Sequence, residues 1–200
     1  MNSLKYSSGL MSHSFWFHEF RTVVKLREKG MDYEQIKKKC IEENLVGAVK
    51  EYRALRITNY IIARVKNMDD RLVELFCESD MPTQKLINLI TVIRTDRLFF
   101  EFLYEVYREK SIIGTGVLEK EDVNVFFTRK ESQSEDIAKW KDTTKKRLGS
   151  LYLNFMVDAN LLTVIDKKRA ITPPILDVEL ERYLLANGED AIVKALTGEN

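Results

Sequence analysis

The sequence predicts an all-α protein built as a multi-helix bundle. Its 200 residues are 44% hydrophobic and 32% charged, and they include only 8 glycines and 3 prolines. Abundant charge with few loop-forming residues is typical of long amphipathic helices rather than of a strand-and-turn fold. Apolar residues in the segment 143–160 also recur at intervals of three, four and seven, which places them on one helical stripe. We therefore expect helices along most of the chain.

Two helices are predicted near the N-terminus. The first covers about 14–29 and stops at Gly30, because glycine commonly follows the last residue of a helix. The second covers about 33–43, since Asp32 can cap it and Gln35 stands three residues further on, as in a capping box. Local signals therefore define both helices.

A central helix is predicted over about 48–66, where neither Gly nor Pro interrupts the chain. Its apolar residues are spread around much of the circumference, which indicates burial on more than one side. Asp69 or Asp70 can cap a short helix that follows. Pro82 suits the first turn of another, and Asp96 begins an aromatic helix that reaches about residue 109.

The segment 114–116, Gly-Thr-Gly, is the best candidate for a domain boundary. It concentrates two of the eight glycines in a short stretch that is typical of a linker. No internal repeat or low-complexity segment suggests another division. We therefore predict an N-terminal helical bundle over 1–113 and a C-terminal helical subdomain over 114–200.

The C-terminal part combines helices with one short hairpin. Helices are predicted over about 120–129, near Trp140 and over about 143–160. Two short β-rich runs within 162–172 flank a polar turn, which favours a hairpin, and a helix over about 178–186 follows. Helix, hairpin and helix in this order indicate a small winged-helix-like element.

Few residues offer catalytic or metal-binding chemistry. His13 and His18 are five apart, which does not place them on one helical face, and no acidic partner stands at metal-ligand spacing. Cys40 and Cys77 are isolated, so we expect reduced, buried thiols. The sequence also lacks a phosphate-binding glycine loop and a nucleophile motif. We therefore expect no enzyme activity, no metal, no cofactor and no small-molecule substrate.

Charge and hydropathy give no reason to expect a membrane protein. No apolar run approaches the roughly 18 residues that a membrane-spanning helix needs. The first residues resemble neither a signal peptide nor a transit peptide. A formal net charge of +1 gives no global attraction to nucleic acid. We expect a cytoplasmic protein whose local charge distribution carries its function.

Aromatic residues are concentrated in the helix that begins after Asp96. Such side chains can stack on bases, but within an apolar helix core packing is the stronger interpretation. The residues concerned are Phe99, Phe100, Phe102, Tyr104 and Tyr107.

Basic residues supply the only functional indication within the sequence itself. The segment 137–170 has 8 Lys and Arg against 3 Asp and Glu, and the segment 21–66 has 12 against 6. In the first of these, two basic triplets occupy the start of the long helix and the predicted hairpin turn. A helix end beside a basic wing is a familiar way to hold DNA phosphates, although charge runs often mark a solvated surface only. The candidate phosphate contacts are Lys145, Lys146, Arg147, Lys167, Lys168 and Arg169.

The helix over 48–66 offers a second, less regular basic face. At 100° per residue its basic side chains share an arc with Ile57 and Tyr60. This helix therefore gives supporting candidates only. They are Lys50, Arg53 and Arg56, with Arg64 on the same arc.

A set of dispersed positions forms an ordered pattern between about residues 5 and 188. It consists of Lys5-Tyr6-Ser7-Ser8-Gly9, Phe15, Glu19, Arg21, Gly30, Glu43-Asn44-Leu45, Trp140, Thr144-Lys145-Lys146 and Pro173-Pro174. This pattern resembles the BrxA family, whose members are small accessory proteins of BREX bacteriophage-exclusion systems. The resemblance brings no catalytic residues with it, and the roles of Tyr6, Gly9 and Glu19 stay unassigned.

The resemblance implies an all-helical fold similar in part to the RNA-binding antitermination factor NusB. It also implies binding of double-stranded DNA and work beside a methyltransferase, an ATPase and other BREX subunits in phage defence. We therefore expect a non-enzymatic DNA-binding accessory protein of antiviral defence. Two alternatives stay open: an adaptor that docks other BREX subunits, and an RNA-binding factor of the NusB kind.

Overall fold

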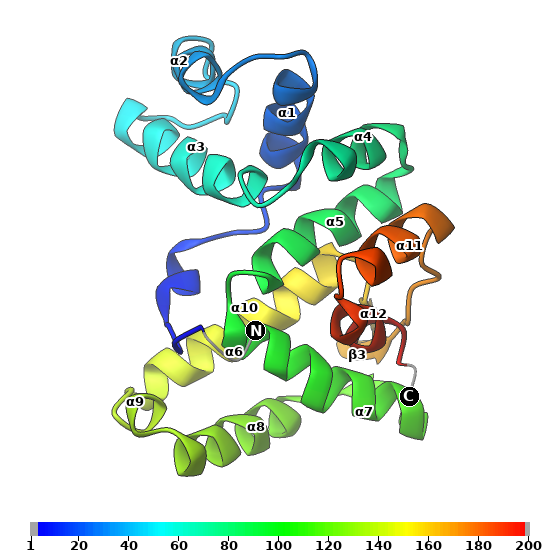
Figure 1. The fold of residues 1–200 in the computed structure, drawn as a ribbon. Helices are drawn as coiled ribbons and strands as arrows, with labels where there is room; N and C mark the ends of the chain where they lie inside the picture. Colours follow the sequence, from blue (N-terminus) through cyan, green and yellow to red (C-terminus); the bar gives the residue numbers. More distant parts are fainter. Residues whose placement is uncertain (1–3, 199–200) are drawn as a thin grey trace. The chain divides into compact units, whose positions relative to one another are not determined.

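The computed structural model describes residues 4–198 and is mainly helical, with one small antiparallel sheet (Figure 1). The predicted all-α, multi-helix class is therefore confirmed. The chain forms two compact units: one takes in Phe15–Val92, and the other takes in the residues up to Ser14 and from Ile93 onward. This division differs from the one predicted at 114–116. The glycine segment lies inside one unit because Val117 and Leu118, which follow it directly, pair with a strand near residue 170.

The unit Phe15–Val92 is a bundle of short helices whose starts follow the predicted caps. The Asp32 side chain accepts a hydrogen bond from Gln35 N at 2.8 Å, and Gln35 Oε1 accepts one from Asp32 N at 3.0 Å, which completes the capping box. Asp69 accepts a hydrogen bond from Leu72 N in the same way. The helices are α1 (Phe17–Glu28), α2 (Tyr33–Glu42), α3 (Glu51–Val65), α4 (Asp70–Glu78) and α5 (Met81–Ile93), which ends at the edge of this unit.

Arg64 of α3 is buried, with only 4% of its surface exposed. Its Nη1 donates a hydrogen bond to the carbonyl oxygen of Phe15 at 3.0 Å, and its guanidinium carbon lies 5.6 Å from the centre of the Trp16 ring. Burial lowers the pKa of Arg64 to about 10. The placement of Arg64 on an exposed basic face was therefore wrong, because helical periodicity cannot tell a solvated arginine from one that fixes a neighbouring segment.

The second unit contains a long helical run that is interrupted by a π-helical turn. It comprises α6 (Arg97–Phe102), the π-helix η2 (Leu103–Tyr107) and α7 (Arg108–Ile113). The predicted cap is present, since Asp96 accepts a hydrogen bond from Phe99 N at 2.8 Å. The run extends four residues beyond the predicted end and stops at Gly114, which adopts a left-handed conformation.

The remaining elements of this unit are mostly the predicted ones. They are η1 (Gly9–Ser12), β1 (Val117–Leu118), α8 (Lys120–Gln133), α9 (Glu135–Ala138), α10 (Asp142–Asp158), β2 (Leu162–Ile165), β3 (Lys168–Ile171), α11 (Val178–Ala186) and α12 (Asp190–Thr197). Strand β1 and helix α12 were not predicted.

Aromatic rings form the core of this unit. The Phe99 and Tyr152 rings stack with centroids 4.5 Å apart, and the Phe102 and Phe126 rings meet edge to face at 5.2 Å. Phe99, Phe102 and Tyr107 are fully buried. Core packing was therefore the correct interpretation for these three residues, and the rings of Phe99 and Phe102 join α6 to α10 and α8.

A buried ion cluster lies beside this aromatic core. Lys130 of α8 is 2% exposed, and its Nζ lies 2.6 Å from Glu101 Oε2 and 2.5 Å from Glu105 Oε1. Arg97 Nε also donates a hydrogen bond to Glu101, at 2.7 Å. Burial of Glu101 opposes its ionisation, but the hydrogen bonds from Lys130 and Arg97 outweigh burial and lower its pKa. The Tyr6 hydroxyl donates to the same carboxylate, at 3.0 Å to Oε2, which ties the N-terminal segment to α6.

The three strands form an antiparallel sheet in the order β1-β3-β2. Leu118 pairs with Arg169, and Arg169 pairs in turn with Val164. The hairpin predicted within 162–172 is therefore present, and a third strand extends it on the far side of β3.

Candidate nucleic-acid interface

The order of elements from β1 to β3 is that of a winged helix. Strand β1 leads into α8, the short α9 turns the chain into α10, and the hairpin β2-β3 follows with β3 beside β1. Figure 1 shows α8, α9 and α10 following one another in this order. In such units the second, or recognition, helix of the helix-turn-helix and the hairpin, or wing, face nucleic acid. Helix α10 and the β2-β3 turn are the two places where the sequence concentrates basic residues.

Helices α8 and α10 approach closely at a glycine. A Cβ atom added to Gly149 of α10 would lie 2.2 Å from Val123 Cγ1 of α8, well inside contact distance. Glycine is therefore the residue that permits this crossing, which explains why a helix-weakening residue stands in the middle of α10. The two hollows described below lie along this crossing.

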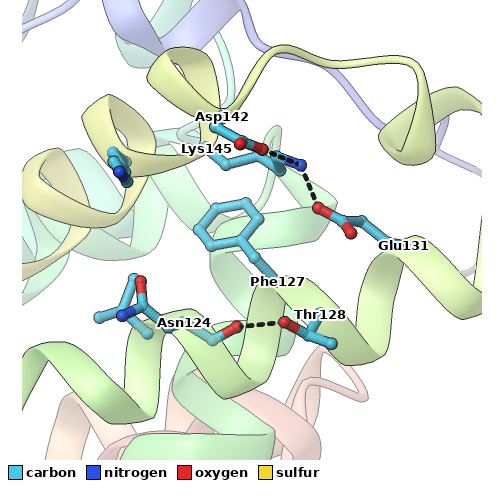
Figure 2. A pocket seen from close by; sticks show the side chains of 8 residues that line it. Asn124, Phe127, Thr128, Glu131, Asp142 and Lys145 are labelled. Atoms are coloured by element: carbon cyan, nitrogen blue, oxygen red, sulfur yellow. Dashed lines mark hydrogen bonds and ion pairs between the residues drawn. The ribbon is translucent and has the colours of Figure 1, made fainter.

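Lys145 lies in the first of these hollows and is neutralised by two carboxylates (Figure 2). Its Nζ lies 2.8 Å from Asp142 Oδ1 and also donates a hydrogen bond to Glu131 Oε1. The hydrogen bonds to Asp142 and then Glu131 raise the pKa of Lys145, and the same contact lowers the pKa of Asp142. Lys145 was predicted as a phosphate contact, but its charge is already balanced by the carboxylates of Asp142 and Glu131.

Lys146 and Arg147 follow Lys145 directly and are both exposed. Lys146 also lines the first hollow, together with Asp142 and Glu131. Lys146 lines the second hollow, which it shares with Arg169 of β3. The structure therefore brings the two predicted basic triplets together at these two residues.

The wing presents Lys167 and Lys168 to solvent. Strand β2 ends at Ile165 and β3 begins at Lys168, so the turn has two central residues, and both have positive φ: 48° at Asp166 and 64° at Lys167. This is the backbone of the tight hairpin turn whose twist matches that of the strands. The turn holds both lysines at the tip of the wing.

Arg169 differs from the two wing lysines because it is half-buried. It lies directly opposite Leu118 in the ladder, and directly paired residues of an antiparallel sheet share a face. Leu118 is 1% exposed, whereas Val164, which pairs with Arg169 on its other side, is 57% exposed, so Arg169 stands between the buried and the exposed part of this face. Arg169 therefore belongs to the wall of the second hollow rather than to the wing tip.

The supporting candidates Lys50, Arg53 and Arg56 are exposed around the start of α3. The Lys50 ammonium lies 6.0 Å from the centre of the exposed Tyr52 ring. These residues belong to the unit Phe15–Val92, whereas α10 and the wing belong to the other. The supporting candidates thus lie on a different unit from the basic residues of α10 and the wing.

Sequence reasoning missed one basic residue of this region, Lys120, which is the first residue of α8 and lines the second hollow. Its charge lies next to Glu119 and Glu121 in the sequence, so no basic run marks it. It also missed Glu131 as the partner of Lys145, because the two residues stand on different helices.

Residues 4–198 show neither a metal-binding cluster nor a membrane-spanning helix. No group of three or more His, Cys, Asp or Glu in this range is arranged to hold a metal ion. No helix of the same range has the length and hydropathy to cross a membrane.

Comparison with known proteins decides the family. The model of the BrxA family matches residues 4–188, nearly the whole chain. The chain belongs to the BrxA family. A BrxA relative, the "BREX protein BrxA" of Bacillus cereus (strain H3081.97), is 34% identical over 194 residues, which cover 97% of each chain. The resemblance drawn from dispersed positions is therefore confirmed.

The same fold occurs in a solved structure, the crystal structure of an uncharacterized protein from Magnetospirillum magneticum. It matches with a TM-score of 0.79 and 16% identity, covering 97% of this chain and 99% of that chain. At this identity the similarity shows the fold alone.

Proposed function

We propose that this BrxA-family protein is a non-enzymatic subunit of a BREX phage-defence system that binds double-stranded DNA through its phosphates. Membership of the BrxA family supports the role in BREX. The observation that carries the DNA-binding part is the winged-helix order of β1 to β3, with exposed basic residues on α10 and at the wing tip. Contacts of this kind position a protein on the duplex and read little sequence.

The charge distribution supports a local rather than a global attraction to DNA. The whole chain has a formal charge of +1, yet the segment 137–170 carries 8 basic against 3 acidic residues. One of those basic residues, Lys145, is neutralised within the fold. Lys146, Arg147, Lys167 and Lys168 are exposed and supply the outer phosphate contacts.

Fluorescence anisotropy at several salt concentrations tests the proposal. Unrelated duplexes, single-stranded DNA and RNA are compared with the same protein preparation. Each neutralised phosphate contributes about 0.9 to the log-log salt slope of duplex binding. The variant Lys167→Gly/Lys168→Gln should lower the slope by about 2 and weaken all duplexes alike. Tighter binding of RNA than of duplex DNA at every salt concentration would instead favour a NusB-like factor.

One observation favours an adaptor as the second candidate. Apolar side chains are exposed beside the basic ones on and after the wing: Val164 is 57% exposed, Ile165 56% and Ile175 98%. Exposed apolar groups of this kind suit a protein partner better than a phosphate backbone. In that case Ile165→Ser/Ile175→Ser would abolish co-purification with another BREX subunit and leave duplex binding intact.

A further inference from the structure

The second hollow, here called the basic pocket, lies between α8, α10 and β3 and measures about 310 Å³. Its polar lining comes from all three elements: Lys120 and Asn124 of α8, Lys146 and Ser150 of α10, and Arg169 of β3. Its apolar lining is Val123, Gly149 and Leu153. The pocket is thus built at the close helix crossing that Gly149 permits.

The lining of the basic pocket contains three cations and no carboxylate. The neighbouring hollow, which shares Val123, Asn124 and Lys146 with it, contains Asp142 and Glu131, and both are used to hold Lys145. The two hollows therefore differ in charge: the first holds two carboxylates bonded to Lys145, and the lining of the basic pocket has none, although Lys146 lines both.

Two of the three acids nearest to Lys120 in the sequence, Glu119 and Asp122, are engaged elsewhere, and the third, Glu121, is exposed and does not line the pocket. Asp122 lies 2.6 Å from Lys110 Nζ, and its carboxylate also accepts a hydrogen bond from Glu119 N. The Glu119 side chain takes part in the same capping box at the start of α8. Lys120 is also the first residue of that helix, where the helix dipole disfavours a cation, so a bound anion would relieve a local repulsion.

Arg169 strengthens the case for an anion. Its Nε is buried and has no hydrogen-bond acceptor among the residues that the structure describes. A buried donor without an acceptor is energetically unfavourable. An anion in the pocket can therefore gain from this arginine without displacing an existing carboxylate.

The ligand chemistry that fits is a phosphate group. Arginine and lysine donors around an acid-free hollow match the several oxygens of phosphate, and the Ser150 hydroxyl and Asn124 amide add neutral donors. The volume is at the lower end of the range for ligand pockets, about 300–1,000 Å³, which suits a phosphate with part of its sugar rather than a large molecule.

We propose that the basic pocket receives a phosphate of the DNA backbone and that Lys120, Lys146 and Arg169 hold it. This inference rests on the proposed function and deepens it, because it places an anchoring phosphate behind the exposed contacts of α10 and the wing. It adds Lys120, which starts α8, to the contact surface. It also gives Arg169 a role distinct from those of Lys167 and Lys168.

The test compares Lys120→Gln and Arg169→Gln with the control Arg182→Gln. Arg182 stands on α11 outside the pocket and is 72% exposed, and its ion pair with Glu179 lies within one helix. Lys120 is exposed, so its replacement should leave the fold intact, as circular dichroism would verify. Each pocket variant should weaken duplex binding about tenfold and lower the salt slope by at most the roughly 0.9 that one phosphate contributes, whereas the control should match the wild type. Arg169→Lys should keep the slope but lose affinity, because lysine cannot replace the arginine fork.

A second arm separates DNA phosphate from free phosphate. Thermal unfolding is measured with inorganic phosphate and with ATP, each at millimolar concentration, for the wild type and Lys120→Gln. If phosphate and ATP shift the unfolding temperature only slightly while duplex DNA binds strongly, the phosphate that enters the pocket belongs to the DNA backbone. If the wild type binds duplexes but both pocket variants behave like the control, the pocket assignment is overturned and the proposed function stands. If the wild type binds no duplex at low salt, the proposed function fails, and the assignment to DNA fails with it.

Discussion

Val123 occupies the space into which a side chain of Gly149 would project: a Cβ at Gly149 would lie 2.2 Å from Val123 Cγ1. We expect Gly149→Ala to destabilise the protein by about 1–3 kcal/mol, since the added methyl forces α8 and α10 apart. This is the reverse of the gain of about 1 kcal/mol that alanine normally gives within a helix. Urea denaturation measures the difference.

A second substitution locates the cause. Val123→Ala in the Gly149→Ala background should recover part of the lost stability by making room for the new methyl group. Equal stability of Gly149→Ala and the wild type would mean that the helices separate at no cost, and the close crossing would have no energetic role.

Lys130 is the second target, because it is 2% exposed and bonded to both Glu101 and Glu105. Lys130→Met keeps the apolar stem but leaves Glu105 without this cation and Glu101 with Arg97 alone, and it should cost about 3–5 kcal/mol. The matched control is Lys139→Met, since Lys139 is 71% exposed and pairs with Glu135 at 3.9 Å. The control should change the free energy of unfolding by less than about 1 kcal/mol. Similar losses in both variants would argue against the buried cluster as a source of stability.

The raised pKa of Asp96 predicts how the stability of the protein depends on pH. Burial raises the pKa of this helix-capping carboxyl from 3.8 to about 6, partly opposed by the hydrogen bond from Phe99 N. Because the folded pKa lies above the unfolded one, the stabilising contribution is full below about pH 4 and is lost as the pH rises through about 6. The shift corresponds to roughly 3 kcal/mol.

Asp96→Asn keeps a capping oxygen but cannot ionise. Relative to the wild type, this variant should therefore gain stability steadily between pH 4 and pH 7, as followed by chemical denaturation across that range. The difference between the free energies of unfolding of the two proteins removes the contributions of the titrating groups that they share. A difference that stays constant over this range would contradict the raised pKa.

Lys167 allows charge and backbone to be separated in the wing. It has a positive φ of 64°, which costs an L-residue about 1–2 kcal/mol and glycine almost nothing. After the entropy cost of glycine, Lys167→Gly should stabilise the fold by roughly 0.5–1 kcal/mol while lowering the salt slope of duplex binding by about 0.9. Lys168→Gln is the control, since it should lower the slope equally without a gain in thermal stability. Unchanged duplex binding in both variants would show that the wing tip does not touch DNA.

Local signals predicted much of the fold because many helix starts are set by neighbouring residues. The cap at Asp69, the capping box at Asp32 and Gln35, and the cap at Asp96 were all found where the sequence placed them. The β2-β3 hairpin was predicted for the same reason, since both strands and their turn lie within ten residues.

The features that escaped prediction depend on distant partners. Strand β1 has only two residues and is a strand solely because it pairs with β3, so no local pattern marks it. The sequence alone places Arg64 on a basic face, because its hydrogen bond to the Phe15 carbonyl depends on a residue far away in the chain. The sequence likewise predicts Lys145 as a phosphate contact, because its partner Glu131 stands on another helix. Helix α12 did carry a local sign, since Gly188 marks the end of α11 and an apolar run follows.

The pairing of β1 with β3 also bears on the order in which the molecule assembles. It closes a loop of about 50 residues that contains the whole helix-turn-helix, and a closure of that length is slower than formation of the neighbouring α8 and α10 contacts. A chain emerging from the ribosome can form both helices early, but β3 can dock only after Ile171 has been released. Arg169 takes its position opposite Leu118 in the same event. The basic pocket would then form in a late, all-or-none step of folding. A chain truncated before β3 would keep its helices but would not form the phosphate-binding pocket.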